Sequence, residues 1–116
     1  MSDATTTVGA LRQAVAEFVD DRDWRQFHNP KNLAMSIAIE AAELMEHFQW
    51  SDLPAAARVA ASPRDMQQIR EELADVLCYA LSLANVLEID VSAALRDKLV
   101  KNAAKYPADR FRGRAR

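Results

Sequence analysis

Residues 62–87 read SPRDMQQIREELADVLCYALSLANVL, a pattern that is helical from end to end. Ser62 supplies a capping side chain and Pro63 suits the first turn of a helix. Apolar residues then recur at helical spacing, at Ile69, Leu73, Val76, Ala80, Ala84 and Leu87. The segment therefore predicts a long helix over residues 63–87 with one face turned to a core.

Three further helices and no strands are predicted on either side of this segment. Each has apolar residues at the same spacing and a capping residue before it, and they span residues 7–21, 30–49 and 90–105. Residues 50–62 are expected to form a connector with a short helix or turn, and residues 107–116 a basic tail. We predict one domain over residues 1–116, all-α and similar to a four-helix bundle.

Composition limits the classes of protein that fit. The chain has 116 residues, 50% of them hydrophobic, with one cysteine and a net charge of −2. One cysteine excludes a disulfide framework and a four-thiolate zinc site. No signal-peptide layout opens the chain, and no apolar run approaches the ~18 residues of a membrane span. We expect a cytoplasmic protein with no membrane partner, and the net charge gives no reason to expect nucleic-acid binding.

Two pairs of carboxylates are the most informative feature for function. Glu40 and Glu43 form one pair, and Glu72 and Asp75 the other, each with its side chains on one helical stripe. Neither pair has a Lys or Arg at helical spacing, although like charges on one stripe cost about 0.2–0.5 kcal/mol. A set of carboxylates alone favours Mg²⁺, with Mn²⁺ as a substitute, and Mg²⁺ commonly bridges protein acids to substrate phosphates. The alternative is a solvated acidic surface.

Aromatic residues gather around the predicted acidic helices. Trp24, Phe27 and His28 precede the first of them, Trp50 follows it, and Tyr79 shares the stripe of the second carboxylate pair. Together they suit a stacking pocket for a nucleobase. Taken singly, each aromatic residue also suits a position in the core.

The last predicted helix carries basic and amide side chains that suit phosphate binding. These are Lys98, Lys101, Asn102 and Lys105. A solvated basic face explains them equally well. Cys78 is expected to project away from the acidic stripe and to serve packing.

In this order along the chain, the motifs resemble those of the MazG-like all-α nucleoside triphosphate pyrophosphatases, and most closely the dCTP pyrophosphatase branch. The segments that carry the resemblance are RDWRQFH at 22–28, EAAE at 40–43 running on to FQW at 48–50, EELADVL at 71–77, and KLVKNAAKYP at 98–107. The resemblance covers roughly residues 11–107.

The resemblance implies a MazG-type fold that assembles as a homodimer or homotetramer with sites at subunit contacts. It implies that the four acids bind Mg²⁺ and that a further set of side chains lines the nucleotide pocket, namely Trp24, Arg25, Gln26, Phe27, His28, Trp50 and Tyr79. Two positions depart from the family pattern. Ile39 stands where many members have a Glu, and Val15 stands where a histidine contacts substrate in some dCTP-type members.

We therefore expect a Mg²⁺-dependent enzyme that converts a nucleoside triphosphate, dCTP or a modified dCTP, to the monophosphate and pyrophosphate, and so cleanses the nucleotide pool. Glu43, as the base, and Glu72 are the candidate catalytic carboxylates, and Lys98, Asn102 and Lys105 would contact phosphates. The enzymatic alternative is a pyrophosphohydrolase acting on phosphoribosyl-ATP or a broad set of triphosphates. The non-enzymatic alternative is a helical oligomerisation module.

Self-association is also expected from the residues themselves. The two central helices carry more apolar residues than one small bundle can cover, among them Ile39, Met45, Leu81 and Val86. Exposed apolar patches of that size mark interfaces, which predicts a symmetric oligomer.

Overall fold

The computed structural model describes residues 1–115, and this part of the chain contains helices and turns but no strand. The elements, in chain order, are α1 (Val8–Asp21), η1 (Arg25–Phe27), α2 (Pro30–Glu46), α3 (Leu53–Ala57), η2 (Val59–Ala61), α4 (Pro63–Leu87), α5 (Val91–Lys105) and α6 (Ala108–Phe111). The all-α prediction and the four main helices are confirmed, as is a short helix in the connector.

Each of the four long helices begins at a predicted cap. The side-chain oxygens of Thr7, Asn29, Ser62 and Asp90 each accept a hydrogen bond from a backbone N–H three residues further on. Such a cap typically contributes about 1 kcal/mol. Local chemistry therefore places the start of every long helix.

The end of α2 differs from the prediction. The helix ends at Glu46 and not at residue 49, because the chain tightens into turns. The N–H groups of Phe48, Gln49 and Ser51 bond to carbonyls three residues back. Asp52 then caps α3 through the N–H of Ala55, so the chain has already changed direction where the apolar pattern still suggested helix.

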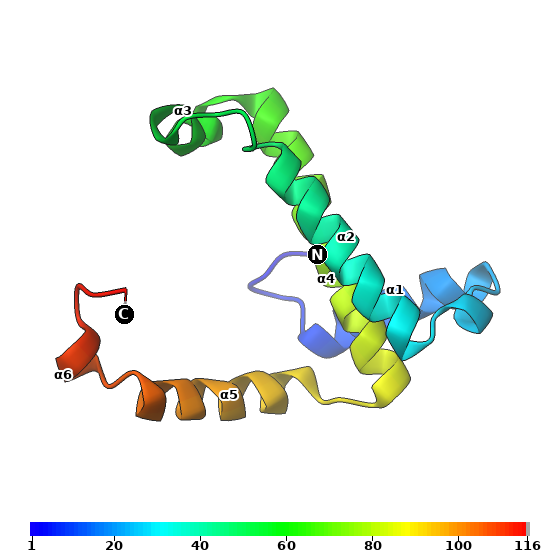
Figure 1. Ribbon diagram of the computed structural model, residues 1–116. Coiled ribbons are helices and arrows are strands. Elements are labelled where there is room, and N and C mark those ends of the chain that lie inside the picture. The colour runs from blue at the N-terminus through cyan, green and yellow to red at the C-terminus, as the bar shows by residue number, and fades with distance from the viewer. Residues whose placement is uncertain (116) are drawn as a thin grey trace.

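The core lies where α2 and α4 pack side by side and α1 crosses α4 (Figure 1). Leu33 of α2 is fully buried, and Val19 of α1 and Ala84 of α4 are nearly so. The connection through α3 and η2 reverses the chain, so α2 and α4 run antiparallel. Two stripes that are far apart in the sequence are thereby brought to face each other.

The fourth long helix does not join this packing within one chain. After α4, Glu88 adopts a left-handed conformation with φ of 54°, and α5 leaves at 103° to α4. Figure 1 shows α5 extending away from the other helices, and its Leu95, Leu99 and Val100 are exposed. Three helices, and not four, therefore pack together in the single chain, and the apolar stripe predicted for α5 is uncovered.

The predicted basic tail contains the short helix α6, and the rings of Tyr106 and Phe111 meet edge to face. Arg116 lies outside the described residues.

Within residues 1–115, no single helix is long and apolar enough to cross a membrane. Only α4 and α5, taken together as a bent pair, meet that test by length and composition.

Candidate functional site

Three carboxylates meet between α2 and α4. Oxygen atoms of Glu40, Glu43 and Glu72 lie within 4.8 Å of one another, and we call these three residues the carboxylate cluster. The antiparallel packing brings them together, since the first two share a stripe of α2 and the third faces them from α4. Asp75, the fourth predicted ligand, is not part of this group and lies about one turn further along α4.

The negative charge of the carboxylate cluster is not neutralised by its surroundings. One oxygen of Glu40 and one of Glu72 are buried, with no hydrogen-bond partner among the described residues. Burial, the adjacent Glu43 and the charges of Asp75 and Glu72 raise the pKa of Glu40 to about 7. The pKa of Glu72 is also raised, by burial first and then by Glu43. Buried, unpartnered anionic oxygens that repel one another are a donor set suited to a divalent cation.

His47 is the nearest basic side chain to the cluster. Its Nε2 lies 3.7 Å from Oε1 of Glu72, beyond hydrogen-bond distance. When protonated, it opposes the rise in the pKa of Glu72. His47 is therefore a neighbour of the cluster, and it offsets only part of the negative charge.

A cavity of about 520 Å³ is lined by Asp75, one turn of α4 from this cluster, and we call it the α1–α4 cavity. Its lining comes from α1, from the segment after α1 and from α4, and comprises Ala14, Val15, Phe18, Val19, Trp24, His28, Asp75, Cys78, Tyr79 and Ser82. Asp75 therefore connects the cavity with the carboxylates. The lining is mainly apolar with a few polar groups, as in sites that bind small molecules.

Cys78 lies in this lining, so the expectation that it points away from the acids was wrong. It follows Asp75 by three residues, which places both side chains on one side of α4. Burial and the charge of Asp75 raise the pKa of the Cys78 thiol.

Three of the predicted aromatic residues come together at the cavity. The rings of Trp24 and His28 lie 6.4 Å apart, as do those of His28 and Tyr79. Nδ1 of His28 is buried without a hydrogen-bond partner among residues 1–115, so it is free to bond a ligand. Burial and the charge of Glu40 raise the pKa of the Tyr79 phenol, which keeps its O–H as a donor.

Other predicted pocket residues lie elsewhere. Phe27 lines a separate hollow beside α2, together with His28 and Tyr79. Gln26 bonds the carbonyl of Asp23, and Trp50 is 90% exposed and lines none of the described cavities. In a single chain these three side chains do not lie in the α1–α4 cavity.

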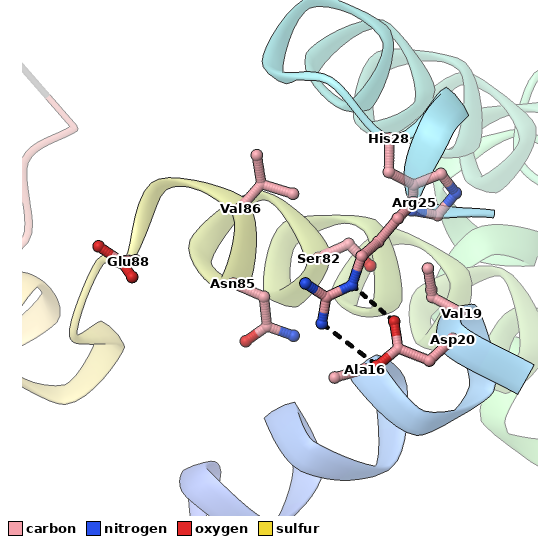
Figure 2. A pocket seen from close by; sticks show the side chains of 9 residues that line it. All are labelled: Ala16, Val19, Asp20, Arg25, His28, Ser82, Asn85, Val86 and Glu88. Atoms are coloured by element: carbon pink, nitrogen blue, oxygen red, sulfur yellow. Dashed lines mark hydrogen bonds and ion pairs between the residues drawn. The ribbon is translucent and has the colours of Figure 1, made fainter. Parts of the chain in front are cut away.

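A second cavity, of about 350 Å³, shares His28 with the α1–α4 cavity, and we call it the Arg25 cavity (Figure 2). Nε of Arg25 donates to Oδ1 of Asp20 at 2.6 Å and a terminal nitrogen donates to Oδ2 at 3.2 Å. Val19, His28 and Ser82 line both cavities, so these side chains separate them. Arg25 is thus occupied in tying the segment after α1 to the end of that helix.

The predicted phosphate-binding residues lie on α5, outside the packed part of the chain. Lys98 and Lys105 are exposed, and Asn102 is half-buried. Nζ of Lys105 lies 5.3 Å from the centre of the Tyr106 ring, on its own helix end. Because α5 diverges from α4 by 103°, one chain does not bring these residues to its own carboxylate cluster.

Sequence reasoning missed Ser82, which is 5% exposed and lies in the wall between the two cavities. It follows Asp75 by seven residues, and Tyr79 by three, so the helical spacing from Asp75 was a signal for it. Asn85, in the Arg25 cavity, gave no comparable signal because its role depends on a residue of α1.

Comparison with known proteins adds to this geometry. A model of the MazG-like family matches residues 35–116. Human dCTP pyrophosphatase 1 is 38% identical over 110 residues, which is 95% of this chain and 65% of that protein, and the bovine protein is 38% identical over 109 residues, 94% and 64% respectively. The chain thus spans about 65% of the length of these relatives.

A solved structure covers the chain more evenly. The crystal structure of a pyrophosphatase from Archaeoglobus fulgidus is 40% identical, with a TM-score of 0.79, and the match covers 92% of this chain and 98% of that one. The likeness therefore extends over almost the whole of both folds.

Proposed function

The chain belongs to the MazG-like family, and from this membership and its carboxylate cluster we propose that it is a Mg²⁺-dependent nucleoside triphosphate pyrophosphohydrolase. We propose dCTP or a modified dCTP as the substrate, with dCMP or its modified form and pyrophosphate as the products. One observation carries the proposal: Asp75, one turn of α4 from the carboxylate cluster, lines a cavity together with Trp24, His28 and Tyr79. The names of the human and bovine relatives support the choice of dCTP.

The residues present fit Mg²⁺. Glu40, Glu43 and Glu72 would hold the ion, and their donors are carboxylate oxygens, two of which are buried without a partner among the described residues. Asp75 would join them from the side of the cavity. Bound there, Mg²⁺ would supply positive charge to neutralise the phosphates, and Mn²⁺ has the same ligand preference.

Glu43 would take the proton of the attacking water. It is the exposed member of the cluster, so water reaches its oxygens, whereas Glu40 and Glu72 each direct one oxygen inward. Glu72 would hold the metal ion from the side of α4. Because both helices pack along each other, the distance between these two carboxylates is fixed by the core.

The base would lie in the α1–α4 cavity. Trp24 and His28 offer ring faces, and stacking on an aromatic side chain is worth roughly 1–3 kcal/mol per base. Nδ1 of His28 and the phenol of Tyr79 offer the polar contacts. With the base there, the triphosphate would run past Asp75 toward the carboxylate cluster, which places the α and β phosphorus atoms nearest the acids.

We also propose that the protein acts as a homodimer or homotetramer. A monomeric protein of 13.0 kDa exposes about 6,300 Å² of surface, whereas this chain exposes 9363 Å². Its radius of gyration of 17.2 Å likewise exceeds the ~13 Å of a compact domain of this length. Surface in excess of what one chain can bury supports association with further copies.

The exposed apolar side chains indicate where a second copy would bind. They lie on α5, at Leu95, Leu99 and Val100, and on α2 and α4, at Met35, Ile39, Met45, Leu73 and Leu77. A second copy that covers these faces would also bring its basic α5 near an acidic cluster. Lys98, Asn102 and Lys105 would then contact the triphosphate held by the neighbouring subunit.

Val15 supports a wider range of substrates than dCTP alone. It lines the α1–α4 cavity at the position where some dCTP-type relatives have a histidine, and its side chain offers no hydrogen bond to a base. A broad triphosphate pyrophosphohydrolase is therefore the second candidate. Either activity would remove unwanted nucleotides from the cellular pool.

The experiment is pyrophosphate release from the eight common ribo- and deoxynucleoside triphosphates and from phosphoribosyl-ATP, with and without Mg²⁺. We expect Mg²⁺-dependent release with the highest kcat/KM for dCTP. Release from phosphoribosyl-ATP alone would contradict the proposed substrate. No release from any compound would favour the oligomerisation module.

A further inference from the structure

Arg12 of α1 makes the most extensive set of side-chain bonds between α1 and α4. Its Nε donates to Oδ1 of Asn85 at 3.0 Å, one terminal nitrogen donates to the carbonyl of Ala84 at 3.1 Å, and the other donates to the carbonyl of Ile89 at 2.5 Å. In return, Nδ2 of Asn85 donates to the carbonyl of Arg12 at 3.1 Å. The two residues are therefore bonded in both directions across 73 positions of sequence.

These bonds reinforce the end of α4. The backbone N–H groups of Glu88 and Ile89 already bond the carbonyl of Ala84, but α4 has no basic residue in its last turn to offset the partial negative charge of its terminal carbonyls. Its cap, Glu88, adopts the left-handed conformation with φ of 54°, which favours glycine. A guanidinium from another helix supplies both donors and positive charge to this terminus.

The apolar contacts of α1 are weak by comparison. Val19 is its one buried residue, while Leu11 is 39% and Phe18 is 49% exposed. Within the described part of the chain, α1 packs chiefly on α4 and forms no comparable contact with another element. The polar clamp of Arg12 and Asn85 therefore has a large share in setting where α1 lies.

The position of α1 matters because this helix forms one wall of both cavities. Val15 and Val19 follow Arg12 by three and seven residues, so they lie on its side of the helix and line the α1–α4 cavity. Asn85 itself lines the Arg25 cavity, together with His28 (Figure 2). The carboxylate cluster, by contrast, is built on α2 and α4 alone.

We propose that Arg12, bonded reciprocally to Asn85, is a positioning residue that holds α1 against α4 and thereby sets the affinity of the α1–α4 cavity for the nucleoside part of the substrate. It does not touch the reacting phosphates. This inference rests on the proposed function, because it takes the cavity to be the nucleoside pocket. It separates two quantities: nucleoside affinity depends on the clamp, whereas metal affinity and kcat do not.

The test compares Arg12→Ala, Arg12→Lys and Asn85→Ala with the wild type and with Gln13→Ala. Gln13 is the matched control, because it neighbours Arg12 but its side chain, among residues 1–115, bonds only to Glu17 within α1. Steady-state kinetics with dCTP and Mg²⁺ give KM and kcat, and calorimetric titration with dCMP measures nucleoside affinity without turnover. Urea denaturation checks that each variant is folded at the assay temperature.

We expect Arg12→Ala and Asn85→Ala each to raise KM and the Kd for dCMP about tenfold, since a displaced wall misplaces the bound group, with kcat within about threefold of wild type. Arg12→Lys keeps the charge but loses the planar fork of donors. Its KM and its Kd for dCMP should therefore lie between those of the wild type and those of Arg12→Ala. Gln13→Ala should match the wild type. If Arg12→Ala does not fold, Asn85→Ala and Arg12→Lys carry the same comparison.

Unchanged KM and dCMP affinity in folded Arg12 and Asn85 variants would overturn the inference. So would a fall in kcat with KM unchanged. A wild type that binds dCMP but releases no pyrophosphate would refute the proposed function alone, and the dCMP titrations would still decide the role of Arg12. A wild type that does not bind dCMP would overturn both.

Discussion

The affinity of the carboxylate cluster for Mg²⁺ should fall about tenfold between pH 8 and pH 6, because one proton competes with the ion at Glu40. The pKa of Glu40 is raised to about 7, by burial first and then by Glu43 and the charges around it. At a pKa of 7 the carboxyl is about 9% ionised at pH 6 and about 91% at pH 8. An ion that requires the ionised form therefore loses a factor of about ten, and its binding releases about half a proton at pH 7.

Calorimetric titration of the nucleotide-free protein with Mg²⁺ measures this dependence. Titrations at pH 6, 7 and 8, each in two buffers of different ionisation enthalpy, give the Kd and the number of protons released. Glu40→Gln should bind Mg²⁺ more weakly and with a much flatter pH dependence. Glu46→Gln is the matched control, since it removes a charge from α2 outside the cluster and should retain the wild-type slope.

Metal-free stability should show the opposite dependence. In the folded protein the pKa of Glu40 lies above its ordinary value of 4.5, so the folded state holds this proton more tightly than the unfolded state. This contribution to the free energy of unfolding is complete below pH 4.5 and is lost as the pH rises through about 7, and the raised pKa of Glu72 acts in the same direction. Urea unfolding midpoints measured at several pH values in the presence of a chelator test this contribution.

A Kd for Mg²⁺ that is equal at pH 6 and pH 8 would refute the predicted competition between the proton of Glu40 and the metal ion.

Four further outcomes follow from the site and the surface. Glu72→Ala or Asp75→Ala should abolish Mg²⁺-dependent turnover while circular dichroism shows unchanged helicity, whereas wild-type activity in both would remove them from the site. Trp24→Ala should raise the KM for dCTP about 10- to 100-fold, from roughly 1–3 kcal/mol of stacking, with Mg²⁺ affinity unchanged; an unaltered KM would exclude stacking on this ring. Leu99→Glu should shift sedimentation from an oligomer toward the 13.0 kDa monomer, and a wild-type monomer at micromolar concentration would contradict self-association. Val15→His should increase the preference for dCTP over the other deoxynucleotides, and the same ratio of kcat/KM values in both proteins would contradict a role for this position in base selection.

The helices of this protein are predictable from sequence because their signals are local. Caps at Thr7, Asn29, Ser62 and Asp90 and apolar residues at helical spacing fix where each long helix begins. The two carboxylate pairs are local in the same sense, since a spacing of three residues places both acids of a pair on one stripe. That the stripes of α2 and α4 would meet was implied by the family resemblance, in which all four acids bind Mg²⁺.

What could not be predicted depends on contacts between distant residues. The divergence of α5 follows from the left-handed Glu88 and the short segment after it, and neither is visible as a pattern. The position of Cys78 is an exception, because it follows Asp75 by three residues and helical spacing alone already places it beside that acid. The clamp of Arg12 on Asn85 joins residues 73 positions apart, where no local signal exists.

The central claim is that a phosphoanhydride bond is cleaved between the α and β phosphorus atoms by a Mg²⁺ site built on the carboxylate cluster. Phosphorus-31 nuclear magnetic resonance of dCTP incubated with the protein and Mg²⁺ identifies the products directly. The account predicts signals of dCMP and pyrophosphate in equal amounts, absent without Mg²⁺ and absent with Glu72→Ala. Signals of dCDP and orthophosphate, or dCTP that remains intact with the folded, metal-supplied protein, would contradict it.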